Sequence, residues 1–168
     1  TRSVLETARV DVPEIDSGLY VAPSAIVHED AVLQPPTLVG PNCEVGPKAV
    51  IGLKTSLGRN VTVGSNTTVQ RSIIDADTRI GAGSTLIECV TGEDVSLGPN
   101  TTVPGGPAEV TFEGHVYQNR DLGAVFADRV TAHGGTTAEP GTLVGPNVTI
   151  DSGVQISGCV PSGTRRTR

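Results

Sequence analysis

The sequence predicts an all-β protein, a solenoid in which short strands and tight corners alternate with a period of six residues. Three observations predict this fold class. Aliphatic residues recur every six positions, small residues follow them four positions later, and the segment Gly-Pro-Asn recurs at three places. The composition agrees, because the 168 residues include 21 Gly and 12 Pro but only 2% aromatic residues. A core of this kind has to be thin and built from small or β-branched side chains.

The aliphatic positions begin at Val21. Stepping by six from there gives nine aliphatic residues in succession: Val21, Val27, Leu33, Val39, Val45, Ile51, Leu57, Val63 and Val69. Each of the first eight is followed four positions later by a small or β-branched uncharged residue. Three such hexads would close one triangular coil of about 18 residues, and coils would stack by strand pairing at about 4.8 Å. We expect the aliphatic side chains in the interior and the small ones in the corners.

The corners have a turn sequence of their own. Gly-Pro-Asn stands at 40–42, 98–100 and 145–147. Proline at the second turn position fixes its φ, and asparagine at the third tolerates a positive φ. These segments therefore predict type II turns between successive strands.

The chain divides into three parts. Residues 1–20 precede the repeat and are expected to form a linker, in which 3–9 could make a short helix. Residues 21–160 are expected to form the β-helix domain. Residues 161–168 contain three arginines and are expected to be a flexible basic tail.

The repeat is irregular in two places. Its period slips around residues 70–96, and residues 105–121 interrupt it before it resumes at Phe126. Insertions in a solenoid project from one face as loops, and such loops often carry function. We therefore expect an excursion loop at 105–121, either functional or simply packed on a neighbour.

Composition and charge restrict the partners. A formal net charge of −6 argues against nucleic acid or an anionic membrane. No apolar run of about 18 residues is present, so no membrane-spanning helix is expected. Three scattered cysteines, Cys43, Cys89 and Cys159, indicate reduced thiols in a cytoplasmic protein rather than a disulfide framework. The chain shows no signal peptide and no initiator Met, which suggests a trimmed or fragment chain.

Three stretches carry a resemblance to a known family: SII at 72–74, SLGPNT at 96–101 and NRDLGAVFAD at 119–128. Through them the chain resembles the carboxy-terminal domain of archaeal-type sugar-1-phosphate nucleotidyltransferases. That family includes bifunctional UDP-N-acetylglucosamine pyrophosphorylase/glucosamine-1-phosphate N-acetyltransferases. The resemblance implies a left-handed parallel β-helix of hexapeptide-repeat type and a homotrimer. It also implies acetyl-CoA as a possible co-substrate and an amino-sugar phosphate acceptor. The glycine-rich loop and acidic metal ligands of the nucleotidyltransferase are absent, so that activity would lie in an upstream domain.

The resemblance also implies a catalytic histidine on the irregular coil, which takes a proton from the attacking amine. That histidine would fall at about Ala82, and no histidine stands between residues 29 and 114. His115, on the excursion loop, is the histidine best placed to substitute, and the alternative is a solvated loop histidine with no catalytic role. The family's lysine before Leu-Gly is Asp121 here, with Arg120 beside it. By resemblance, the substrate and acyl-CoA cleft would involve Asn119, Arg120, Leu122, Gly123 and Ala124.

Two other functions remain open. The missing histidine favours a non-catalytic trimerisation or regulatory domain of an NDP-sugar pyrophosphorylase, whereas the retained excursion favours a ligand cleft. The second alternative is a zinc site of the γ-carbonic anhydrase type, made from His28, His115 and His133. Their spacing does not converge on one point, so we expect no metal in this domain.

Overall fold

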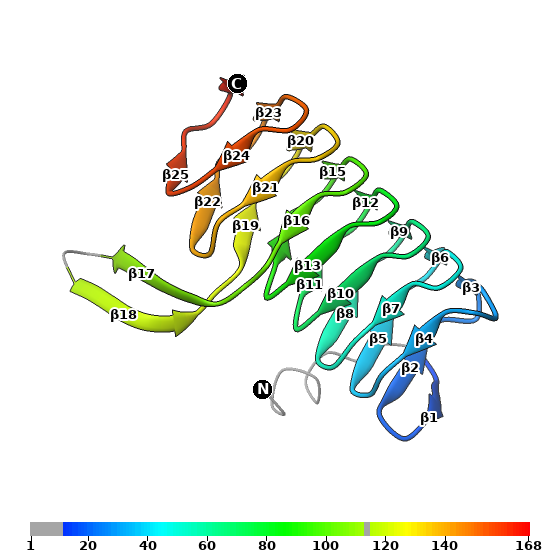
Figure 1. Cartoon of the computed structure of the whole chain (residues 1–168). Helices are drawn as coiled ribbons and strands as arrows, with labels where there is room; N and C mark the ends of the chain where they lie inside the picture. Colours follow the sequence, from blue (N-terminus) through cyan, green and yellow to red (C-terminus); the bar gives the residue numbers. More distant parts are fainter. Residues whose placement is uncertain (1–11, 113–114) are drawn as a thin grey trace.

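The computed structural model describes the backbone of residues 12–112 and 115–168, and the side chains of residues 12–108 and 121–168. Every regular element among these residues is a β-strand. The expectation of an all-β solenoid is therefore confirmed, while the short helix expected at 3–9 lies outside the described residues. Figure 1 shows the strands stacked coil upon coil along one axis.

Three sheets form the sides of a triangular prism. Sheet A contains, in spatial order, β1 (Glu14–Asp16), β2 (Leu19–Val21), β5 (Thr37–Val39), β8 (Thr55–Leu57), β11 (Ile73–Ile74), β14 (Val90–Thr91), β19 (Ala124–Phe126), β22 (Thr142–Val144) and β25 (Cys159–Val160). Sheet B contains β3 (Ile26–Val27), β6 (Glu44–Val45), β9 (Thr62–Val63), β12 (Arg79–Ile80), β15 (Ser96–Leu97), β20 (Thr131–Ala132), β23 (Thr149–Ile150) and β26 (Arg165–Arg166). Sheet C contains β4 (Val32–Leu33), β7 (Val50–Ile51), β10 (Thr68–Gln70), β13 (Thr85–Ile87), β16 (Thr102–Val103), β21 (Thr137–Ala138) and β24 (Gln155–Ile156). All these pairs are parallel except β1 with β2.

The interior matches the predicted pattern. Val39, Ile51 and Leu57 are fully buried, and Phe126 fills the interior where the repeat resumes. The small residues four positions after the aliphatic ones are buried in the corners, as at Cys43 and at Thr67, whose hydroxyl donates to the Gly81 carbonyl at 3.2 Å. A hydroxyl is tolerated in these corners because a backbone carbonyl of the next coil accepts its hydrogen bond.

The predicted turns are also confirmed. Asn42, Asn100 and Asn147 each have a φ of 57°. Lys48 adopts the same φ of 57°, so the corner geometry is imposed even where the residue is not asparagine. Left-handed backbone costs a residue with a Cβ roughly 1–2 kcal/mol, and strand pairing on either side of the corner offsets that cost.

One edge of the prism absorbs every change in coil length. Each coil passes from sheet A to sheet B and then to sheet C. At both of these corners the inward-facing residues of the two strands are six positions apart, in every coil. From sheet C to sheet A the step is six, six, five, five, twenty-three, six and four. The slip predicted around residues 70–96 therefore comes from two corners that are each one residue shorter than the regular step of six. Arg71 lies in the first of these corners and Glu88 in the second. We call this border between sheets C and A the variable edge.

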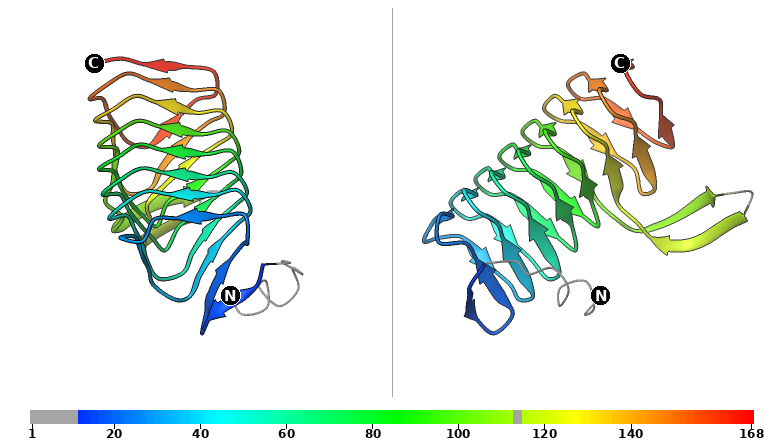
Figure 2. Two further views of the ribbon diagram at one scale, coloured as in Figure 1. Left: turned by 90° about the vertical axis from the view of Figure 1, so that its right-hand side faces the viewer. Right: turned by 180° about the vertical axis from the view of Figure 1, so that it is seen from behind.

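The step of twenty-three residues contains a hairpin. Strands β17 (Pro107–Phe112) and β18 (His115–Asp121) pair antiparallel with each other, and within the described backbone they pair with no strand of the prism. They project from the stack in Figure 1 and in the right-hand view of Figure 2. This hairpin is the excursion expected at 105–121.

The stack continues slightly beyond 21–160 at both ends. Leu19 in β2 pairs with Thr37, and β26 pairs with β23 through Thr149–Arg165 and Ile150–Arg166. The segment expected to be a flexible basic tail therefore adds a strand to sheet B, because Arg165 and Arg166 continue its hydrogen-bonding register. Figure 2 shows β25 and β26 at the end of the prism opposite to β1 and β2.

Candidate functional site

The base of the hairpin lies at the largest interruption of the six-residue repeat, the step of twenty-three residues. Gly123 packs against the variable edge so closely that a Cβ added there would overlap the carbonyl oxygens of Ile87 and Glu88. Its amide donates to the Glu88 carbonyl at 3.1 Å, and the Leu122 amide donates to the Gly106 carbonyl at 2.9 Å. The two ends of the hairpin are therefore anchored to each other and to the coil below.

An ion pair lies on the same edge, in the two coils that lack a corner residue. Arg71 Nε donates to Glu88 Oε1 at 2.9 Å. The Glu88 side chain is 18% exposed, and its Oε2 is buried without a hydrogen-bond partner among the described residues. Sequence reasoning did not select these two residues. The one-residue loss from the repeat at each of their corners is the signal that could have identified them.

The predicted cleft residues do not all reach the surface. Leu122 is 36% exposed, whereas Gly123 is buried and Ala124 is only 1% exposed. Ala124 faces the interior as the first residue of β19, so it presents no side chain to a ligand, and Gly123 can offer only backbone. The chain turns back into the prism directly after Leu122, so Gly123 and Ala124 could line a cleft only through their backbone, and their place in a ligand cleft stays a prediction.

The other predicted residues lie on the hairpin. His115 pairs with Phe112 and Arg120 pairs with Ala108 across β17 and β18, and Asn119 lies in β18 beside Arg120. Their side chains lie outside the described set, so the catalytic role suggested for His115 stays a prediction. Strand β18 places their backbone in the hairpin that projects from the variable edge.

Ala82, where the family's histidine would fall, lies on a different edge. It is exposed at the corner between β12 and β13, which borders sheets B and C. The hairpin leaves from the other border of sheet C. Sheet C therefore separates the expected position of the catalytic base from the hairpin base within one chain.

The histidines with described side chains do not form a metal site. His28 and His133 both lie on the border between sheets B and C, five coils apart, which is about 24 Å at the strand spacing of a sheet. Among the described residues no group of three or more His, Cys, Asp or Glu is placed to hold a metal ion. The distance between these two histidines excludes a shared zinc within one chain.

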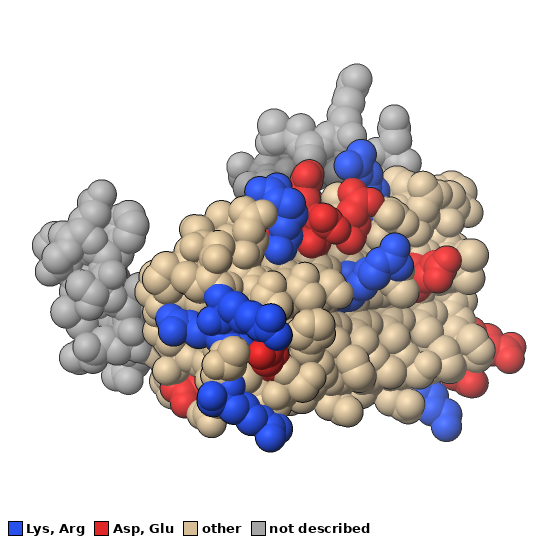
Figure 3. Space-filling model, turned by 90° about the horizontal axis from the view of Figure 1, so that it is seen from above, with Lys and Arg blue, Asp and Glu red and all other residues tan. Residues whose placement is uncertain are grey.

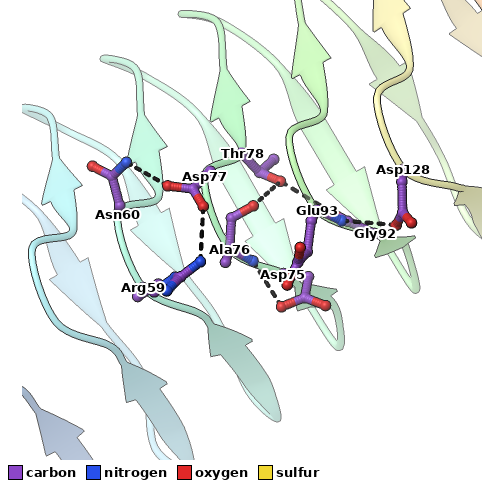
Figure 4. A network of polar contacts seen from close by, with 9 residues as sticks. All are labelled: Arg59, Asn60, Asp75, Ala76, Asp77, Thr78, Gly92, Glu93 and Asp128. Atoms are coloured by element: carbon purple, nitrogen blue, oxygen red, sulfur yellow. Dashed lines mark hydrogen bonds and ion pairs between the residues drawn. The ribbon is translucent and has the colours of Figure 1, made fainter. Parts of the chain in front are cut away.

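Acidic residues gather on the third edge, between sheets A and B (Figure 4). Asp77 accepts hydrogen bonds from Asn60 at 2.7 Å and from Arg59 at 3.4 Å in the preceding coil. Asp128 accepts one from the Glu93 amide at 3.1 Å. These carboxylates satisfy donors of neighbouring corners, so we assign them to coil stacking rather than to ligand binding.

A broad, open hollow lies on the described surface near β26. It has a volume of about 620 Å³ and is lined by His133, Asp151, Ser152, Arg165 and Arg168. Figure 3 shows Lys and Arg side chains close together on part of the face seen from above. Arg165 is held by Asp151 at 2.9 Å, so one of the two arginines in this open hollow is already neutralised.

Comparison with known proteins identifies the architecture. A family model described as the GMPPB C-terminal domain matches residues 15–119. A hexapeptide transferase family protein from Anaplasma phagocytophilum is 20% identical, with a TM-score of 0.63, and the match covers 80% of this chain and 74% of that one. UDP-N-acetylglucosamine acyltransferase from Francisella novicida is 14% identical, with a TM-score of 0.50, over 86% of this chain and 57% of that one.

At these identities the solved structures show a shared fold, the left-handed β-helix of hexapeptide-repeat proteins. No curated protein matches the chain at a significant level. None of the described residues belongs to a helix long and apolar enough to cross a membrane.

Proposed function

Because the chain belongs to the GMPPB C-terminal domain family, we propose that it is the β-helix module of a sugar-1-phosphate nucleotidyltransferase-type protein. The family match over residues 15–119 carries this proposal. Nucleotide transfer would take place in a separate upstream domain. The module's own role would be to organise or regulate that domain, in the cytoplasm.

A non-catalytic role is supported by what the irregular coils contain. Ala82 stands where the resemblance implies a general base, and the two shortened corners hold an Arg71–Glu88 ion pair. An ammonium acceptor has no lone pair, so acyl transfer to an amino sugar needs a group that removes its proton. Among the described side chains at the hairpin base, the carboxylates of Glu88 and Asp121 are the groups that could take this proton, and Glu88 is already paired with Arg71.

A second candidate function is acyl transfer from acetyl-CoA to an amino-sugar phosphate, and the retained hairpin favours it. His115 would be the base, with Asn119, Arg120 and Leu122 near the substrates. In such a reaction the amine nitrogen attacks the thioester carbonyl, the base takes the amine proton, the carbon–sulfur bond breaks, and the base returns the proton to the departing sulfur, so that CoA leaves as the thiol. Backbone amides at the hairpin base could stabilise the developing oxyanion.

One experiment separates the two functions. We expect no turnover of acetyl-CoA with glucosamine-1-phosphate, and no CoA binding by calorimetry. Turnover that falls by about 10²–10⁴-fold in His115→Ala, and not in the exposed control His28→Ala, would establish acyl transfer instead. Turnover unaffected by His115→Ala would establish acyl transfer with a different base.

Self-association is part of the proposal, since the resemblance implies a homotrimer. The described prism has three different faces. Which of these faces is buried by self-association would determine how many copies assemble. The mass of the 17.2 kDa chain in solution is therefore an informative first measurement.

A further inference from the structure

The hollow near β26 lies on the border between sheets B and C and is lined by polar and charged side chains. It has a volume of about 620 Å³, and the residues that line it are His133, Asp151, Ser152, Arg165 and Arg168. None of these five is apolar, so the described lining offers no hydrophobic wall of the kind that holds a nucleobase or an acyl chain. A ligand in this hollow has to be recognised through charge and hydrogen bonds.

Asp151 orients the guanidinium of Arg165. The Nε of Arg165 donates to Asp151 Oδ1 at 3.0 Å, and a terminal nitrogen lies 2.9 Å from the same oxygen. Strand pairing brings the two residues together, because β26 continues sheet B next to β23. A guanidinium has five N–H donors, and the Arg165 side chain is 68% exposed. The pair therefore fixes the arginine and still leaves donors for a ligand.

Gly153, two residues after Asp151, gives space to the second arginine. It has a φ of 67°, and a Cβ added there would overlap the guanidinium of Arg168. The guanidinium therefore lies directly on the backbone of this corner. Both arginines are thus placed by one corner, residues 151–153, and Ser152 between the two contact points also lines the hollow.

The preceding coil contributes His133. Strand β20 pairs with β23 in a register that places Ala132 next to Ile150, and the His133 amide donates to the Ile150 carbonyl at 2.9 Å. His133 is therefore one strand spacing, about 4.8 Å, from Asp151. Its ring faces the same hollow and supplies a further nitrogen that can donate a hydrogen bond.

Oriented guanidinium groups with a hydroxyl and an imidazole beside them are the groups that bind phosphate oxygens. Two arginines against one aspartate leave the hollow with a positive balance, although the whole chain has a formal net charge of −6. We propose that this hollow binds the phosphate group of a small polar ligand, either free phosphate or diphosphate or a phosphate carried on a sugar. The site does not depend on whether the module is catalytic.

The test is calorimetric titration of the 168-residue chain with inorganic diphosphate and, separately, with glucose-1-phosphate. Arg165→Gln and Arg168→Gln each remove one cation from the hollow. Arg166→Gln is the matched control, because it removes the same charge from the same strand. Arg166 pairs with the buried Ile150 and lines a different hollow at the end of the stack. Circular dichroism checks that each variant keeps its β-sheet signal.

We expect saturable binding of both phosphates to the wild type, and no binding of glucose. Arg165→Gln and Arg168→Gln should each weaken phosphate binding by about tenfold or more, whereas Arg166→Gln should change it by less than about twofold. Tighter binding of diphosphate would identify a free anion as the ligand, and tighter binding of glucose-1-phosphate would identify a sugar phosphate.

Three results overturn the proposal. The first is the absence of saturable binding at phosphate concentrations up to about 10 mM. The second is an unchanged affinity in both hollow variants. The third is an equal loss in Arg166→Gln, which would show only a general attraction to the basic end of the chain. CoA is titrated into the wild type and Arg165→Gln as well, so that attraction of its phosphates to the hollow is not mistaken for binding in an acyl-transfer cleft.

Discussion

At the scale of single residues, the two buried cysteines show how the narrow interior treats an ionisable group. Cys43 and Cys89 occupy corner positions and are fully buried, and Cys43 Sγ donates to the Gly58 carbonyl at 2.8 Å. Burial raises the pKa of the Cys43 thiol, and it raises the pKa of Cys89 to about 12. Cys159, in contrast, is exposed on sheet A.

The raised pKa of Cys89 predicts a loss of stability in alkali. Above about pH 9 the unfolded chain releases this proton while the folded chain keeps it, so the free energy of unfolding falls as pH rises. The expected slope is about 1.4 kcal/mol per pH unit between about pH 9 and pH 12. Urea unfolding at several pH values should show a shallower decline in Cys89→Ala. Cys159→Ala should keep the wild-type slope, and an equal change in both variants would contradict the assignment.

The scale of the strand and corner shows what the sequence could and could not predict. Nine aliphatic residues at a spacing of six predicted the coils, and Gly-Pro-Asn predicted the turns, because interior volume and backbone φ depend on a few local residues. The sequence also revealed a slip near 70–96. It did not show that both missing residues fall on one edge, since every hexad looks alike until the sheets are assembled.

The same limit applies to the candidate site. Ala124 looked like a cleft residue in the motif but faces the interior, because the chain re-enters the prism there. The Arg71–Glu88 pair joins two residues that the linear repeat does not mark as neighbours. A stacking distance of one coil brought them together, and that distance becomes visible only once the corner lengths are known.

Gly123 makes a second prediction. Gly123→Ala should destabilise the protein by about 1–3 kcal/mol, because its Cβ would overlap backbone carbonyl oxygens that cannot move without shifting the coil. Gly134→Ala is the matched control, since its Cβ would lie 3.1 Å from the Pro99 carbonyl oxygen, the nearest atom. Thermal unfolding should show the larger drop in Tm for Gly123→Ala, and equal drops would mean that the hairpin base can rearrange.

At the scale of the whole molecule, stability is a sum over coils that contact only their neighbours. The two ends are not equivalent. Val27 and Leu33 in the first coil are only partly buried against the core, whereas Ile156 and Val160 near the other end are 4% and 2% exposed. The first coil has the smaller share of apolar burial and should open most easily.

Hydrogen exchange should reveal this difference. We expect amide protection in β3 and β4 to be at least about tenfold lower than in β6 and β7, because the first coil can open without disturbing the rest. Mass spectrometry of peptides covering 24–35 and 42–53 makes the comparison within one experiment. Equal protection in the two peptides would mean that the first coil unfolds together with its neighbours.

The variable edge also affects how relatives of this chain should be aligned. Gaps and insertions belong on that one border, because the other two keep six residues between inward positions along the whole stack. An alignment that distributes gaps evenly would place a histidine or arginine on the wrong side of the prism while preserving its apparent match. Before the role of a residue is assigned from a relative, its position in the coil should therefore be determined by counting from the two corners of constant length.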